Sequence, residues 1–160
     1  MSPEERAEAG GDGQHEAGAE SVEEARASAV ATTLVSPLRC EGVPADATHL
    51  VGVRRGVEEW ALKAGLSRET VTDVVAASYE AMANAAEHAY RERSGTIDLL
   101  ATCHEDDVEI IVRDRGDWRP PPADPGFRGR GLVMIRTMSH AEIDPGPDGT
   151  TVRMRWPRGR

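Results

Sequence analysis

Two segments with alternating apolar residues constrain the fold of this chain more than any other feature. Apolar side chains recur at every second position in Thr96–Cys103 and again in Val108–Asp114, which is typical of strands that bury one face. The acidic turn over residues 105–107 makes the pair antiparallel. Because each strand has one good apolar face, helices are expected on one side only. The predicted class is α/β (α+β), a two-layer α/β sandwich with a mixed, mostly antiparallel sheet covered on one face by helices.

Capping residues mark the helices that are expected to cover this sheet. Pro44-Ala45-Asp46 opens a helix that runs to about Lys63, and Ser67 opens a longer helix that reaches about Tyr90. A short helix is predicted over Leu132–Met138. The remaining strands are predicted at Thr32–Leu38, Ala141–Asp144 and Thr150–Trp156, the last two forming a hairpin.

The length and the first residues set the expected domain organisation. A chain of 160 residues suffices for one domain with a buried core. Residues 1–28 contain no Leu, Ile, Phe, Tyr or Trp, which predicts a disordered acidic tail rich in Ala, Gly and Glu, and residues 29–160 are then a single domain. The sequence shows neither an apolar run long enough for a membrane span nor a signal peptide at its start. Cys40 and Cys103 have no metal-ligand or redox spacing, so a cytoplasmic location is the simplest interpretation.

The charge distribution excludes two classes of phosphate-binding protein. Of the formal net charge of −9, −6 lies in residues 1–28 and −3 in residues 29–160. This argues against a nucleic-acid binder, because such a protein presents a basic face. Lys63 is the only lysine beside eighteen arginines, and no Gly-Lys-Ser/Thr sequence exists, so a P-loop is excluded. Any phosphate group must be held by arginines, backbone amides or a metal ion.

The predicted long helix carries two oxygen-bearing side chains on the side that faces away from the core. At about 100° per residue, its apolar positions gather on one side, Glu80 lies opposite, and Asn84 follows one turn later. A solvated helix face would also explain this pair. However, Asn84 is the only asparagine, it sits mid-helix where asparagine is unfavourable, and small alanines surround it. Open space beside a carboxylate and a carboxamide suits a magnesium–phosphate group.

Two glycine-containing segments add to this pair, although each has an ordinary turn or hinge as its alternative. Asp114 ends a predicted strand two residues before Gly116, and a carboxylate there accepts a hydrogen bond from an exocyclic amine such as that of adenine. The glycine loop Gly126–Gly131 leads into a helix, so backbone amides and a helix N-terminus are available to an anion. Arg128 and Arg130 add positive charge to this loop.

The order of these elements, with Asp148-Gly149-Thr150 before the last strand, resembles the nucleotide-binding boxes of the Bergerat (GHKL) ATPase superfamily over about residues 32–157. The similarity is greatest to its anti-sigma-factor serine/threonine kinase branch, the RsbW-like branch. The motifs that carry it are Glu80-Ala-Met-Ala-Asn84-Ala-Ala-Glu-His88-Ala89-Tyr90, Asp114-Arg-Gly116-Asp-Trp118 and Gly129-Arg130-Gly131-Leu132. Histidine kinases need a phosphoacceptor helical hairpin that the tail cannot supply, and gyrase- and chaperone-type ATPases need further domains.

The resemblance implies the Bergerat ATP-binding fold and a division of roles at a site for ATP and Mg²⁺. Asn84 would coordinate the metal ion, and Glu80 would be the catalytic residue, as general base or orienter of the attacking hydroxyl. Asp114 would bind the adenine amino group, with Thr150 behind it. The other cofactor-binding residues would be Gly116, Arg128, Gly129, Arg130, Gly131 and Leu132. His88 receives no role.

Two functions from different classes are compatible with this site. In the first, implied by the resemblance, the protein is a kinase that phosphorylates an antagonist (anti-anti-sigma) protein and sequesters a sigma factor. Such a kinase would act as a homodimer, without direct contact to nucleic acid or membrane. In the second, it is a non-catalytic binding module that sequesters a partner and uses ATP only structurally or not at all. Glu80 and Asn84 favour the kinase, because a pure binder needs neither a base nor a metal ligand.

Overall fold

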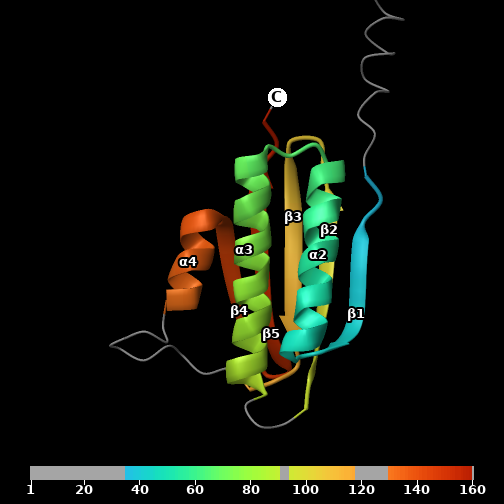
Figure 1. Cartoon of the computed structure of the whole chain (residues 1–160). Coiled ribbons are helices and arrows are strands. Elements are labelled where there is room, and N and C mark those ends of the chain that lie inside the picture. The colour runs from blue at the N-terminus through green and yellow to red at the C-terminus, as the bar shows by residue number, and fades with distance from the viewer. Residues whose placement is uncertain (1–34, 91–93, 118–129, 160) are drawn as a thin grey trace, which may run out of the picture. The chain divides into compact units, whose positions relative to one another are not determined.

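A five-stranded sheet forms one layer of the protein (Figure 1). The computed structural model describes residues 35–90, 94–117 and 130–159, without the side chain of His88. The strands are β1 (Leu38–Pro44), β2 (Thr96–Cys103), β3 (Asp107–Asp114), β4 (His140–Gly146) and β5 (Gly149–Pro157). They lie in the order β1-β2-β3-β5-β4, and all neighbours pair antiparallel. The predicted fold class is confirmed, and within the described residues the sheet contains no parallel pair.

Three α-helices cover one face of this sheet, as Figure 1 shows. They are α2 (Ala47–Lys63), α3 (Arg68–Asn84) and α4 (Arg130–Met138), and a short π-helix, η1 (Ala85–Ala89), follows α3 directly. The two long helices begin at the expected caps. The carboxylate of Asp46 accepts a hydrogen bond from the backbone N of His49, and Ser67 Oγ accepts one from that of Thr70, each at 3.1 Å. Each cap satisfies an amide that the first helical turn leaves unpaired.

The hydrophobic core lies between the helices and the covered face of the sheet. The inward positions of β2 and β3 are buried, as their alternation predicted, and so are Val152, Met154 and Trp156 of β5. Val74 and Met82 of α3 are completely buried against them. These side chains hold one side of α3 in the core. The directions in which the other side chains of α3 point are therefore determined as well.

The first strand was predicted in the wrong place. Thr32–Leu38 was expected to be a strand, but Val35–Pro37 has no regular structure, and β1 begins at Leu38; residues 32–34 lie outside the described residues. Pro37 has no N–H to donate to a ladder. The pairing of β1 with β2 shifts register between Cys40 and Val43, where Gly42 adopts a φ of 63°. This bulge interrupts the period of two, so the alternation in β1 is limited to Leu38–Glu41 and is too short to mark the strand in the sequence.

The end of the long helix also differs from the prediction. An uninterrupted helix to about Tyr90 was expected, but α3 ends at Asn84 and the chain continues as η1 to Ala89. π-helical turns are rare and occur often at functional sites. The predicted tail over residues 1–28 lies outside the described residues. Among the residues that the structure describes, no helix is long and apolar enough to cross a membrane.

Candidate functional site

Glu80 and Asn84 meet the start of α4 in a group of three residues that we call the helix cluster: Glu80, Asn84 and Gly131. A Cβ atom added at Gly131 would lie 2.8 Å from Asn84 Oδ1, 3.0 Å from Asn84 Nδ2 and 3.1 Å from Glu80 Oε2. The backbone of Gly131 therefore lies directly beside both polar side chains. α3 and α4 pack against each other (Figure 1). Two separate parts of the sequence therefore build the helix cluster.

The hydrogen bonding of the Asn84 carboxamide in this cluster is incomplete within the described residues. Its Nδ2 atom is buried and has no hydrogen-bond partner among the residues that the structure describes, and an unpaired buried polar atom costs about 1–3 kcal/mol. The N-terminus of α4 lies beside it, and the helix dipole at a helix N-terminus favours an anion. A carboxamide, a carboxylate and a helix N-terminus are the groups that would hold a metal-bound phosphate, so these residues fit Mg²⁺ and ATP.

Asp114 is the centre of a second group, the strand cluster: Asp114, Gly116 and Thr150. The carboxylate is buried, with 6% of the residue exposed. Its Oδ1 atom accepts hydrogen bonds from the backbone N of Gly116 at 2.9 Å and from that of Thr150 at 3.3 Å. No described residue donates to Oδ2. One carboxylate oxygen is thus held by the protein, and the other remains to accept a hydrogen bond from a ligand.

Close backbone packing fixes the strand cluster in place. A Cβ atom added at Gly149, which has a φ of 128°, would overlap the carbonyl oxygen of Asp114. One added at Gly116 would overlap the carbonyl oxygen of Ala89, and that same oxygen accepts a hydrogen bond from the backbone N of Asp117 at 3.2 Å. η1 therefore links the two clusters, because it begins after Asn84 and ends against the loop that follows Asp114.

The predicted site residues fall into these two clusters, with exceptions. Glu80, Asn84, Gly131 and the first residue of α4, Arg130, lie at the helix cluster, and Asp114, Gly116 and Thr150 form the strand cluster. Leu132 packs partly buried against the hydrophobic core, so its side chain anchors α4. Arg128 and Gly129 lie outside the described residues. Gly149 and Ala89 were missed as packing partners, because their contacts join segments far apart in sequence.

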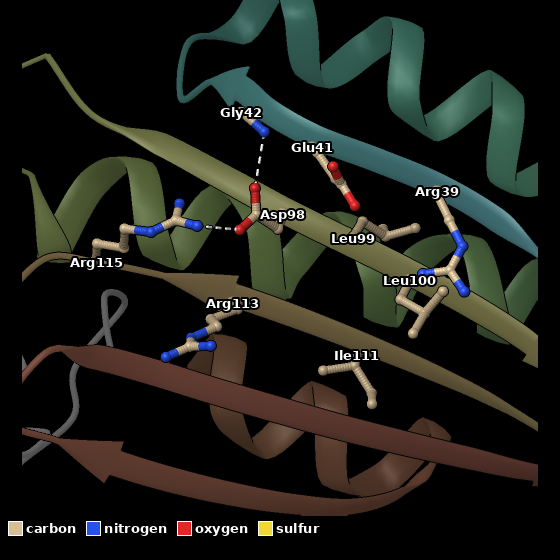
Figure 2. Close-up of a pocket in the computed structure, with 9 residues that line it drawn as sticks. All are labelled: Arg39, Glu41, Gly42, Asp98, Leu99, Leu100, Ile111, Arg113 and Arg115. Atoms are coloured by element: carbon tan, nitrogen blue, oxygen red, sulfur yellow. Dashed lines mark hydrogen bonds and ion pairs between the residues drawn. The ribbon is translucent and has the colours of Figure 1, made fainter.

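A separate cavity of about 460 Å³ lies on the sheet face that the helices leave uncovered (Figure 2). Arginines and acidic residues line it around Leu100 and Ile111. Asp98 is its best-connected group, because its carboxylate accepts a hydrogen bond from Gly42 N at 2.7 Å and pairs with the guanidinium of Arg115. The Gly42 hydrogen bond, with Arg115, lowers the pKa of Asp98 against the opposing effect of burial. Side chains that form a salt bridge therefore line this cavity, which lies on the side of the sheet opposite α3.

Comparison with known proteins identifies the family. Residues 43–156 match the model of the histidine kinase-like ATPase domain. The serine-protein kinase RsbW of Bacillus cereus is 32% identical over 127 residues, which cover 70% of this chain and 79% of that protein. The chain therefore belongs to the histidine kinase-like ATPase family, and its resemblance to the RsbW-like, anti-sigma-factor kinase branch is confirmed.

Two further comparisons are partial. The RsbW of Oceanobacillus iheyensis is 36% identical over 76 residues, and the chain spans about half of that relative, 48% of its length. The crystal structure of the RsbU and RsbW domains of Rv1364c from Mycobacterium tuberculosis superposes with a TM-score of 0.63 at 29% identity, covering 78% of this chain and 33% of that chain. These matches agree on the fold and on the RsbW-like family.

Proposed function

We propose that this protein is a Mg²⁺- and ATP-dependent serine/threonine protein kinase of the anti-sigma-factor type. The observation that carries the proposal is the helix cluster. The backbone of Gly131 lies against both Glu80 and Asn84, and Asn84 Nδ2 is buried without a hydrogen-bond partner within the described part of the chain. A structural helix contact would have satisfied that amide with a neighbour, whereas a site for a charged ligand leaves it open. Membership of the ATPase family supports the nucleotide as that ligand.

Each residue of the two clusters has a proposed role in phosphoryl transfer. Asn84 holds the Mg²⁺ ion, and Glu80 orients the attacking hydroxyl and accepts its proton. Arg130 and the start of α4 face the phosphates, and Arg128 and Gly129 keep the phosphate-binding role that the family resemblance implies. A bound Mg²⁺ ion supplies charge neutralisation on the transferred phosphate. Asp114 accepts a hydrogen bond from the adenine amine through Oδ2, while its other oxygen stays on the backbone amides of Gly116 and Thr150.

The proposed partners follow from the family and from the names of the relatives. The matched RsbW proteins are named serine-protein kinases, which supports a serine or threonine as the phosphoacceptor. We propose that the acceptor belongs to an antagonist protein, that a sigma factor is the sequestered partner, and that the kinase is a cytoplasmic homodimer. Light scattering of the purified chain tests the dimer, and pull-down of a sigma factor with and without ATP tests the sequestration.

Phosphate transfer to a candidate antagonist protein tests the kinase against a binding-only module. With ATP labelled at the γ-phosphate and Mg²⁺, we expect wild-type transfer and at least about a hundredfold loss in Glu80→Ala. Thermal stabilisation by Mg²⁺-ATP should remain in that variant, because the carboxylate acts on the hydroxyl and not on the nucleotide. Glu58→Ala, a change at an exposed glutamate of α2, is the matched control and should transfer normally. Equal transfer by wild type and Glu80→Ala would reject the assigned base.

A further inference from the structure

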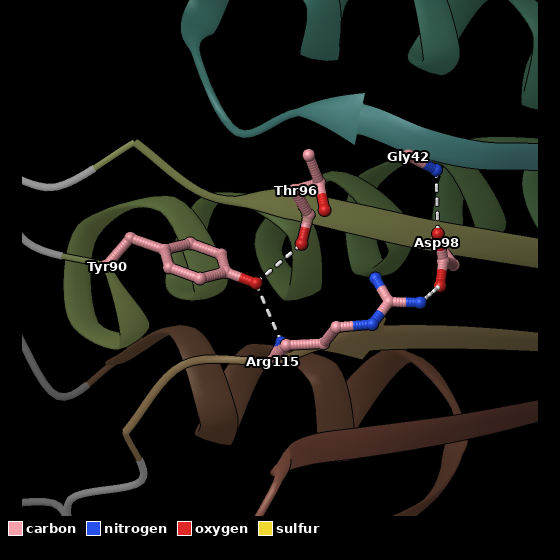
Figure 3. Close-up of polar contacts among 5 residues, drawn as sticks. All are labelled: Gly42, Tyr90, Thr96, Asp98 and Arg115. Atoms are coloured by element: carbon pink, nitrogen blue, oxygen red, sulfur yellow. Dashed lines mark hydrogen bonds and ion pairs between the residues drawn. The ribbon is translucent and has the colours of Figure 1, made fainter.

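Tyr90 bridges two backbone segments next to the strand cluster. It is the residue after η1 and is buried, with 8% exposed. Its hydroxyl donates a hydrogen bond to the carbonyl oxygen of Thr96 at 2.6 Å and accepts one from the backbone N of Arg115 at 2.7 Å (Figure 3). Thr96 begins β2, and Arg115 follows Asp114 directly. One hydroxyl therefore connects the end of the helical segment, the start of one strand and the loop after another.

The position of the Tyr90 ring is itself tightly determined. A Cβ atom added at Gly95 would overlap the aromatic carbons of Tyr90, so the ring packs flat against the backbone just before β2. The preceding residue, Ala89, accepts the hydrogen bond from Asp117 N. Consecutive residues at the end of η1 thus hold both Arg115 and Asp117, the residues that flank Gly116.

The side chain of Arg115 adds a second attachment to the same loop. Its guanidinium pairs with Asp98 of β2, and the other oxygen of that carboxylate accepts the hydrogen bond from Gly42 N at the β1 bulge (Figure 3). The backbone of Arg115 is held by Tyr90 and its side chain by Asp98. However, the Arg115 and Asp98 side chains are partly exposed, at 54% and 25%, where an ion pair is worth little. The buried Tyr90 hydrogen bonds carry most of the restraint.

We propose that Tyr90 is a positioning residue for recognition of the nucleotide base. It would act through the backbone of Arg115, which fixes the direction in which the adjacent Asp114 carboxylate presents Oδ2. This inference rests on the proposed function, because it needs Asp114 to receive the base. Removing the hydroxyl leaves the Arg115 amide and the Thr96 carbonyl without their partner, and the loop relaxes to recover hydrogen bonds elsewhere. The Asp114 carboxylate then no longer presents Oδ2 in a fixed direction, while the helix cluster remains in place.

The discriminating measurement compares two nucleotides in Tyr90→Phe. Inosine triphosphate has the triphosphate of ATP but carries an oxygen where adenine has its amino group. A site built to hydrogen-bond that amine prefers ATP. In Tyr90→Phe, we expect the affinity for ATP to fall about tenfold and that for inosine triphosphate to stay close to its wild-type value, so the preference shrinks. Isothermal titration with Mg²⁺ gives both dissociation constants.

Tyr79→Phe is the matched control, since Tyr79 is the only other tyrosine and lies on α3 with its ring near Arg54. It should keep the wild-type affinities for both nucleotides. A merely structural role for Tyr90 would lower both affinities in proportion, and this result would overturn the proposal. An unchanged ATP affinity in Tyr90→Phe would overturn it as well. Failure of wild type to bind Mg²⁺-ATP would instead remove the proposed function itself.

A measurement on the unsubstituted chain covers the case in which Tyr90→Phe does not fold. Incorporation of 3-fluorotyrosine gives one fluorine signal for each of the two tyrosines, and Tyr79→Phe assigns them. We expect ATP to shift the Tyr90 signal more than inosine triphosphate does, because the hydroxyl senses the loop that carries Asp114. Equal shifts with the two nucleotides, or no shift with either, would contradict the proposed positioning role.

Discussion

The helix cluster and the strand cluster use glycine in opposite ways. In the helix cluster, the atoms nearest to a methyl group at Gly131 would be the ends of the Asn84 and Glu80 side chains. Those ends can move to other rotamers at small cost. Beside the strand cluster, a methyl group at Gly149, the residue before Thr150, would meet the backbone of Asp114, which cannot move without disturbing the sheet.

The difference between rigid backbone contacts and movable side chains matches the two tasks proposed for this site, which are recognition of the base and transfer of the phosphate. Recognition of a flat base needs donors and acceptors in a fixed frame, and the strand cluster is built from backbone contacts. Binding and release of the phosphates require contacts that form and break in each cycle, and the helix cluster ends in side chains. Changes that disturb the backbone packing of the strand cluster should therefore affect stability, whereas changes in the side chains of the helix cluster should affect ligand binding and transfer.

The largest effect is expected for Gly149→Ala. The residue has a φ of 128°, and its new methyl group would overlap the carbonyl of Asp114. We expect the free energy of unfolding to fall by about 3 kcal/mol or more, measured by urea denaturation. Gly146→Ala, in the same hairpin, is the matched control, because its added Cβ would lie 3.4 Å from Gly149 O. If the free energy of unfolding falls no more in Gly149→Ala than in Gly146→Ala, the strand cluster is not held by rigid backbone packing.

Gly131→Ala should separate binding from stability. Alanine favours a helix over glycine by about 1 kcal/mol, which offsets the displacement of the two side chains, so the free energy of unfolding should change by less than about 1 kcal/mol. The affinity for Mg²⁺-ATP should fall about tenfold, because Asn84 and Glu80 must turn aside. Gly52→Ala on α2, where an added Cβ meets nothing within 4 Å, serves as control and should bind normally. Strong destabilisation by Gly131→Ala would show that this cluster is also a rigid frame.

The smallest effect is expected for Asp98→Asn, outside both clusters. The lowered pKa of Asp98 means that its ionised form stabilises the fold above the unfolded pKa, about 3.9, and that this contribution disappears as the pH falls through the folded value. We expect a loss of less than about 1 kcal/mol at neutral pH that vanishes in acid, followed by urea denaturation across pH. Glu105→Gln, at an exposed turn position, should show no such pH-dependent difference. A loss that persists in acid would exclude the carboxylate charge as its cause.

The structural features that were predicted most accurately from the sequence are those that depend on a regular period or on a short motif. The alternation in β2 and β3 placed these strands and their buried faces correctly, and Asp46 and Ser67 placed the helix starts. The spacing of Glu80 and Asn84 placed them on one side of the same helix, but the expected open space beside them is occupied by the start of α4. Each of these features is encoded within one segment, so local propensity and burial agree.

What the sequence did not predict depends on contacts between distant segments. β1 was misplaced because its bulge at Gly42 limits the alternation to the four residues before it. η1 has no local signal, and its place becomes meaningful only when Ala89 meets Gly116. Tyr90 belonged to the recognised motif, but its role emerges only from the backbone of Arg115, 25 residues away. Glycines and hydroxyls that join such segments carry no periodic signature.

Binding of Mg²⁺-ATP by wild type and Asp114→Asn tests the central claim most directly, namely that the two clusters form one nucleotide site. Asparagine keeps the size of the side chain but replaces an acceptor oxygen with a donor NH₂ group. By isothermal titration, we expect wild type to bind ATP and Asp114→Asn to bind at least about tenfold more weakly, with both proteins folded by circular dichroism. No binding by wild type, or equal binding by the two, would contradict the account.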